Sequence, residues 1–166
     1  MAGRFIFWRM QMKSIKKLLF VMAALAAVFG LVACSDDDDD PSTVAVFEDS
    51  YTNAGAKYTE TITFYDDGTF KNVTTIEGVR TFTAATGTYK GDVTKDTSNT
   101  NKVTYTVKKY ANKKGELVSI EDAIKEELGA VAADELVKEI LKGFTDASAT
   151  ITGKTLTCDL GTYTRK

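Results

Sequence analysis

The residues that could perform chemistry in this chain are few. There is no histidine, and the only cysteines are Cys34 and Cys158. Histidine is the side chain most often used as a general base and as a metal ligand. Its absence excludes Ser/His/Asp and Cys/His catalytic sites and zinc sites built on histidine. The remaining candidates are carboxylates, one thiol that no histidine can activate, and a Gly-Lys-Thr triplet.

Each of these candidates is better explained by structure than by catalysis. Asp66 and Asp67 are neighbours on a tight turn, so their carboxylates point apart into solvent, unlike the facing pair of a glycosidase. Cys158 has no histidine to make it a nucleophile. The triplet 153–155 lacks the upstream glycine of a phosphate-binding loop. We therefore expect no enzymatic activity, no metal site and no cofactor.

Cys34 ends a segment that is organised like a bacterial export signal. A cationic stretch, 12–17, precedes an uncharged run, 18–33. The run is shorter than the ~20 residues of a permanent membrane span, which is the alternative interpretation. Residues 31–34, Leu-Val-Ala-Cys, resemble the lipobox of bacterial lipoproteins. This resemblance implies cleavage before Cys34 and covalent lipids on that residue, which anchor the protein to a membrane.

The rest of the chain divides around this signal. Residues 1–11 fit poorly ahead of it, so Met12 is expected to be the true start and 1–33 the signal peptide. Residues 34–42 form the lipidated cysteine and an acidic tether, in which Asp36 to Asp40 repel one another and keep the chain extended. Calcium is the alternative partner of such a run, but the spacing and glycine of an EF-hand loop are missing.

The acidic run also carries information about location. Directly after a lipidated cysteine, it resembles the surface-export signal of lipoproteins from the Bacteroidetes. Ser35, in place of an aspartate, avoids the inner-membrane retention signal of other Gram-negative lipoproteins. The two resemblances together imply an outer-membrane protein that is lipid-anchored and exposed on the cell surface.

Charge argues against nucleic acid as a partner. The chain has 21 Lys and Arg against 23 Asp and Glu. Residues 1–33 hold five of the bases and none of the acids, and Asp36 to Asp40 account for five acids. The domain from residue 43 is therefore left with 18 acids against 16 bases. A nearly neutral domain of mixed sign offers no basic surface to phosphate.

Residues 43–166 are expected to form a single β-rich domain. Threonine, valine and aromatic residues alternate with polar ones, which favours half-buried strands. The loop Asp66-Asp67-Gly68 predicts a hairpin that places Phe64 opposite Phe70 on the inner face. Eight segments carry the strand pattern: Val44–Tyr51, Lys57–Tyr65, Thr69–Glu77, Val79–Lys90, Lys102–Tyr110, Ala149–Thr152, Lys154–Cys158 and Thr162–Arg165.

A helical segment interrupts the strands before the last three. Residues 119–122, Ser-Ile-Glu-Asp, are typical of a capping box. From Ile120 to Leu141 apolar residues, including Val131, recur at helical spacing, and Gly129 is expected to break the helix. Such an amphipathic stripe is expected to pack against the sheet.

Strands joined by successive hairpins predict an antiparallel up-and-down β-barrel of about eight strands, with a β-sandwich as the alternative. The segments 61–70, 87–89 (Gly-Thr-Tyr) and 161–163 (Gly-Thr-Tyr) resemble the lipocalin-like domains of Bacteroidetes lipoproteins. The helical insertion departs from a plain lipocalin, whose helix follows the eighth strand.

The lipocalin-like resemblance implies that the barrel binds a small apolar or amphipathic molecule. The residues that would line such a site are Phe64, Phe70, Phe82, Tyr89, Val103, Tyr105 and Tyr163. Eight-stranded barrels are either filled by side chains or hold one ligand, so these residues could equally form a core. A structural or accessory protein of an outer-membrane assembly, with a protein partner that the sequence does not name, is the alternative function.

Overall fold

The computed structural model describes residues 41–94, 100–129 and 134–166. The predicted signal peptide, lipobox and Asp36–Asp40 run lie outside the described residues, as does Val131 of the helical stripe.

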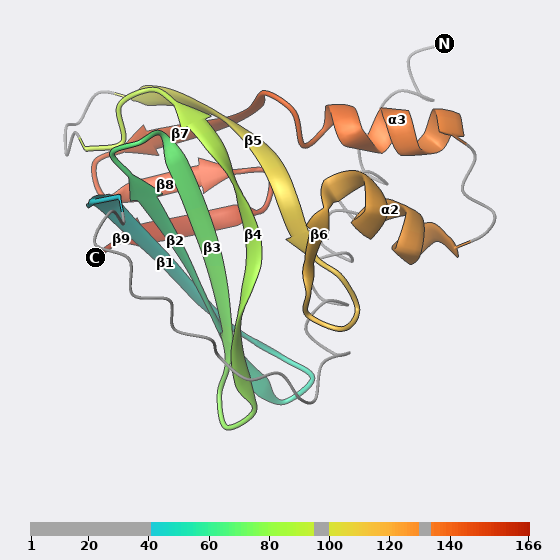
Figure 1. Cartoon of the computed structure of the whole chain (residues 1–166). Helices are drawn as coiled ribbons and strands as arrows, with labels where there is room; N and C mark the ends of the chain where they lie inside the picture. Colours follow the sequence, from blue (N-terminus) through green and yellow to red (C-terminus); the bar gives the residue numbers. More distant parts are fainter. Residues whose placement is uncertain (1–40, 95–99, 130–133) are drawn as a thin grey trace, which may run out of the picture.

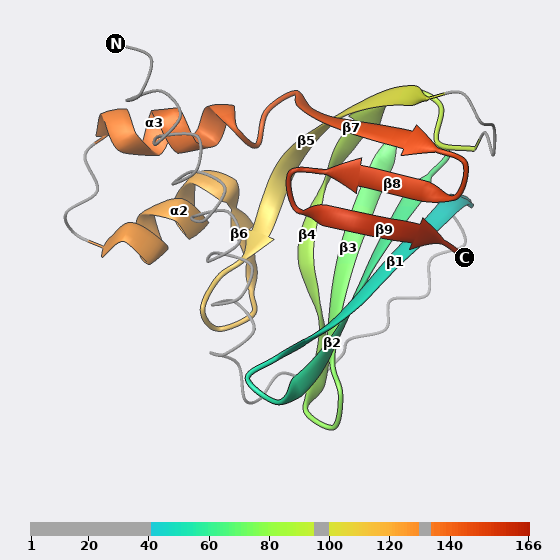
Figure 2. The same ribbon diagram turned by 180° about the vertical axis from the view of Figure 1, so that it is seen from behind.

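Eight strands close into an antiparallel barrel (Figures 1 and 2). The ring runs β4-β3-β2-β1-β9-β8-β7-β5, and pairing between β4 and β5 closes it. The predicted up-and-down barrel with a helical insertion before the last strands is confirmed. The alternative, a β-sandwich, is excluded because the strands form one closed sheet. The elements are β1 (Thr43–Asn53), β2 (Ala56–Tyr65), β3 (Thr69–Ile76), β4 (Arg80–Lys90), β5 (Asn101–Ala111), β6 (Leu117–Ser119), α2 (Ile120–Leu128), α3 (Asp134–Lys142), β7 (Ala147–Thr152), β8 (Thr155–Cys158) and β9 (Gly161–Arg165).

The hairpin predicted between β2 and β3 is present in the expected register. Gly68 adopts a φ of 81°, which L-residues with side chains rarely tolerate. Phe64 pairs directly with Phe70 across the two strands. Both side chains are buried in the main core inside the barrel, so the period-2 pattern gave the correct inner face.

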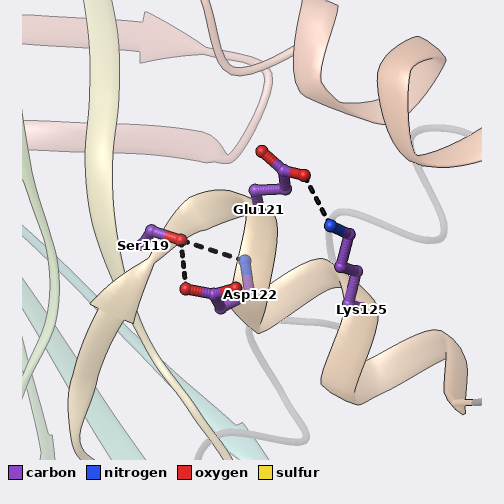
Figure 3. Close-up of polar contacts among 4 residues, drawn as sticks. All are labelled: Ser119, Glu121, Asp122 and Lys125. Atoms are coloured by element: carbon purple, nitrogen blue, oxygen red, sulfur yellow. Dashed lines mark hydrogen bonds and ion pairs between the residues drawn. The ribbon is translucent and has the colours of Figure 1, made fainter. Parts of the chain in front are cut away.

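The predicted capping box begins α2 (Figure 3). The hydroxyl of Ser119 accepts a hydrogen bond from the backbone N–H of Asp122 at 3.1 Å and donates one to its carboxylate at 2.6 Å. Gly129 ends the helix, as expected. On the exposed face, Lys125 forms an ion pair with Glu121 at 2.6 Å.

Helices α2 and α3 lie together on one side of the barrel, beside β5 and β6 (Figures 1 and 2). Ala123 and Ile124 of α2 and Val137 and Ile140 of α3 belong to the main core. The expected packing of the stripe on the sheet is therefore confirmed. Within the described part of the chain, neither helix has the length and hydropathy of a membrane span.

The sequence pattern missed β6, a three-residue strand that pairs with the end of β5. Its hairpin depends on Asn112, whose side-chain oxygen accepts hydrogen bonds from the N–H groups of Lys114 and Glu116 at 3.0 and 2.9 Å. A strand of this length is too short to show an alternating pattern.

The first four strands are longer than the last three, and they project past the closed ring (Figure 1). A second, small core forms in this projection around Tyr58 and Ile76. There the rings of Tyr51 and Tyr58 stack with their centroids 5.3 Å apart.

Within the ring, the first and last strands of the domain lie side by side. β1 and β9 share only two register pairs, Phe47 with Arg165 and Glu48 with Thr164. An ion pair of 2.7 Å between Lys166 and Glu48 reinforces this seam. Every strand of the ring, and every residue of the main core, lies between Thr43 and Arg165. A chain starting at Pro41 therefore contains all the elements that its barrel needs to fold.

Candidate functional site

A cavity of about 30 Å³ lies among the side chains inside the barrel. That volume is enough for about one or two water molecules. Most of its wall consists of buried apolar side chains from six strands, among them Ile62, Ala85, Val107, Ala149 and Leu156.

The structure brings four of the seven predicted lining residues to this cavity. Phe64, Phe70, Val103 and Tyr105 all contribute to its wall. The ring of Phe70 contacts that of Tyr105 edge-on, with 6.1 Å between centroids, and that of Phe64 at 6.2 Å. Aromatic pairs of this kind stabilise the wall by more than the burial of their surface area alone.

Tyr89 and Phe82 do not line the cavity, contrary to expectation. The hydroxyl of Tyr89 donates a hydrogen bond of 2.8 Å to the carbonyl of Tyr65, which holds the side chain at the β2–β3 turn. Phe82 lies in the projecting part of β4, where it packs against both the main core and the second core, with the Arg80 guanidinium 4.3 Å from its ring centre. A single strand pattern cannot show that β4 extends beyond the ring.

Tyr163, the third residue outside the cavity wall, belongs instead to a buried polar cluster. Its hydroxyl donates a hydrogen bond of 2.8 Å to one oxygen of Glu60. The hydroxyl of Tyr51 donates to the other oxygen at 2.9 Å. Burial raises the pKa of the Glu60 carboxyl, the two tyrosine hydrogen bonds lower it, and the charge of Asp49 raises it further. The net pKa shift is upward.

This shift predicts that Glu60 weakens the fold as pH rises. The folded state holds the proton more tightly than the unfolded chain, so the contribution to stability is complete below the ordinary glutamate pKa and is lost as pH rises through the folded pKa. Glu60→Gln, which cannot ionise, is expected to gain in stability relative to wild type between pH 4 and pH 8. Urea unfolding of both proteins at each pH gives this difference, because the other titrating groups cancel. A constant difference would contradict the prediction.

The rim of the cavity is formed by its only partly exposed lining residues, Tyr105, Cys158 and Leu160. Burial and the neighbouring Cys158 thiol raise the pKa of the Tyr105 hydroxyl. Burial raises the pKa of the Cys158 thiol, so the thiol is mainly protonated at neutral pH and its reactive thiolate is a minor form.

One polar residue in the cavity wall, Asn72, escaped the sequence analysis. The residue is 2% exposed, and neither its amide nitrogen nor its amide oxygen has a hydrogen-bond partner among the described residues. The signal was available: Phe70, Asn72, Thr74 and Ile76 share one face of β3, so alternation alone places an amide inside the barrel.

No group of three or more potential metal ligands occurs among the residues with described positions. Comparison with protein-family models, with curated protein sequences and with solved structures finds no match.

Proposed function

We propose that this chain is a lipid-anchored outer-membrane lipoprotein, exposed on the bacterial cell surface, whose lipocalin-like barrel binds a small apolar or amphipathic molecule. The observation that supports ligand binding is the apolar cavity inside a closed eight-stranded barrel. The lipobox resemblance of residues 31–34 and the acidic run after Cys34 support the location.

The cavity dimensions constrain how a ligand is held. A space of about 30 Å³ is smaller than any molecule of more than a few heavy atoms. The ligand therefore enters past the partly exposed rim residues Tyr105 and Leu160, which move aside, and places its narrow end between Phe70 and Val107. An unbranched chain suits such a site better than a fused ring system.

The first experiment looks for the natural ligand and its place in the barrel. Native mass spectrometry of the full-length protein, purified from its own host, is expected to show a bound small molecule. The rim thiol of Cys158 then reports where the molecule sits: its alkylation by iodoacetamide is expected to be slower with the ligand bound. Absence of any co-purifying molecule, or unchanged alkylation, would count against this function.

A non-enzymatic structural or accessory role in an outer-membrane assembly is the second candidate. The observation that favours it is the small cavity, since the interior of the barrel is largely filled by its own side chains. The same mass spectra separate the two functions, because this role requires no small molecule in the barrel.

The anchor gives a separate prediction. Cys34→Ser is expected to abolish lipid attachment and to leave an uncleaved precursor, because the peptidase of this pathway acts only after the thiol has been acylated. Radiolabelled palmitate incorporated in the host measures this effect directly. A Cys158→Ser variant is the matched control, and it should incorporate palmitate like the wild type. Label in the Cys34 variant would contradict the prediction.

A further inference from the structure

Asn72 is held inside the barrel without the partners that a buried amide needs. Among the described residues it alone leaves both polar atoms of its side chain buried and unpartnered. A buried polar group without a hydrogen bond destabilises a fold, and such groups are rare in native proteins. Because the amide lies in the wall of the cavity, a molecule in that cavity can satisfy it.

The backbone keeps Asn72 in this position. It is a strand residue that pairs with Ile62 of β2 on one side and Ala85 of β4 on the other. Successive side chains of a strand alternate between its faces, so Asn72 reaches solvent only if β3 changes register on both sides. The amide is therefore a fixed part of the cavity.

The surroundings of the amide determine the charge of the molecule that fits. The cavity wall contains no lysine, arginine, aspartate or glutamate. Beside it on the inner face, Glu60 comes two residues before Ile62 on β2, and both its oxygens already accept hydrogen bonds from tyrosines. An anion would lie near this carboxyl group without a cation, and an ammonium group would lose its water with no carboxylate in the cavity wall to balance its charge. Both arrangements are costly in an apolar interior.

We infer that Asn72 recognises the polar end of an uncharged amphiphile, one that carries a hydroxyl or carboxamide group on a short unbranched chain. A primary amide both donates and accepts hydrogen bonds, and these two headgroups do the same without charge. This inference rests on the proposed ligand-binding function and adds the chemical class of the ligand.

The test compares headgroups on one chain length. The domain starting at Pro41, labelled with ¹⁵N, is titrated at pH 7.5 with hexanamide, 1-hexanol, hexanoate, hexylammonium and, as a purely apolar probe, toluene. Chemical-shift changes at the cavity strands give the affinities. Hexanamide and 1-hexanol are expected to bind at least tenfold more tightly than hexanoate and hexylammonium. Equal affinity for charged and uncharged hexyl compounds would overturn the inference, and this comparison needs no variant.

Asn72→Leu, which keeps nearly the same side-chain volume, is expected to lower the affinity for hexanamide at least tenfold. The matched control is Thr74→Val, because Thr74 is the next inward residue of β3, is also buried, and lies outside the cavity wall. The Thr74→Val variant should bind each probe with an affinity within twofold of that of the wild type. Unchanged hexanamide binding in Asn72→Leu would overturn the inference.

Two further results separate this inference from the proposed function. Toluene binding without binding of the four hexyl compounds would leave a purely apolar ligand site and overturn the role of Asn72. Failure of all five probes would overturn both. In the ligand-free domain, Asn72→Leu is expected to raise the urea midpoint of unfolding, because it removes two unpartnered groups. A lower midpoint would show that water satisfies the amide, which would also overturn the inference.

Discussion

Gly87→Ala is expected to prevent the barrel from closing. A Cβ atom at Gly87 would lie 2.0 Å from the backbone oxygen of Thr106 on β5 and 2.7 Å from the ring of Phe70. The first contact is with a backbone atom of the neighbouring strand, so no side chain can rotate to relieve it. The pairing between β4 and β5, which closes the ring, has to open instead.

We expect a loss of more than ~3 kcal/mol, at or beyond the upper range for overpacked sites. A domain of this size is stabilised by only about 5–15 kcal/mol, so such a loss is a large fraction of its free energy of unfolding. Urea unfolding of the domain that starts at Pro41 measures the loss. Gly161→Ala is the matched control, since its Cβ would meet the Tyr163 ring at 3.6 Å, an ordinary contact.

A double variant tests the cause of the loss. Phe70→Leu removes the aromatic ring from the second contact but leaves the Thr106 oxygen in place. It should therefore fail to rescue Gly87→Ala. Rescue would show that the ring, rather than the backbone of β5, excludes the methyl group.

Phe70→Ala is expected to cost about 3–5 kcal/mol, the usual range for a buried phenylalanine. Phe70 is 7% exposed, belongs to the main core and lies over Gly87, its partner across β3 and β4. The cavity beside it is small, so most of the Phe70 ring is packed against other side chains and little of it faces empty space. Removing the ring opens a new void and uncovers the Gly87 backbone.

The size of this loss in stability shows whether the barrel interior around Phe70 is filled or contains open space. A value near 1 kcal/mol, within the range of ordinary substitutions, would show that the wall relaxes around space that already exists. Urea melts of the domain that starts at Pro41 provide the measurement. Phe82→Ala is the control for any effect on ligand binding. Phe82 lies outside the cavity, so its truncation should leave the affinity for hexanamide unchanged.

The features that could be predicted from the sequence are those set by neighbouring residues. Alternation and turn glycines gave the strands, the hairpin at Gly68 and the facing pair of Phe64 and Phe70, and Ser119 gave the start of the helix. These features depend on local backbone preferences and side-chain periodicity.

The composition of the cavity could be predicted only in part, because it depends on strands far apart in the chain. Phe144 reaches the wall from the segment between α3 and β7, and Cys158 reaches it from β8. Phe82 lies outside the ring because the pairing of β4 with β5 begins only at Ala85, so this part of β4 pairs with β3 alone. Such differences between strands arise from tertiary pairing. Asn72 was overlooked because an amide among threonines resembles an ordinary polar position.

The seam between β1 and β9 has a consequence for how the domain folds. The two strands that meet there are the first and last of the barrel, separated by almost its entire length. Contacts between such distant residues require the largest loop closure and slow the folding of β proteins. The barrel cannot be complete until Arg165 is available, so shortened chains remain open along one side. With so few ladder bonds, the backbone amides at this seam should exchange with deuterium before those of β2 and β3, whose pairing extends over their full length.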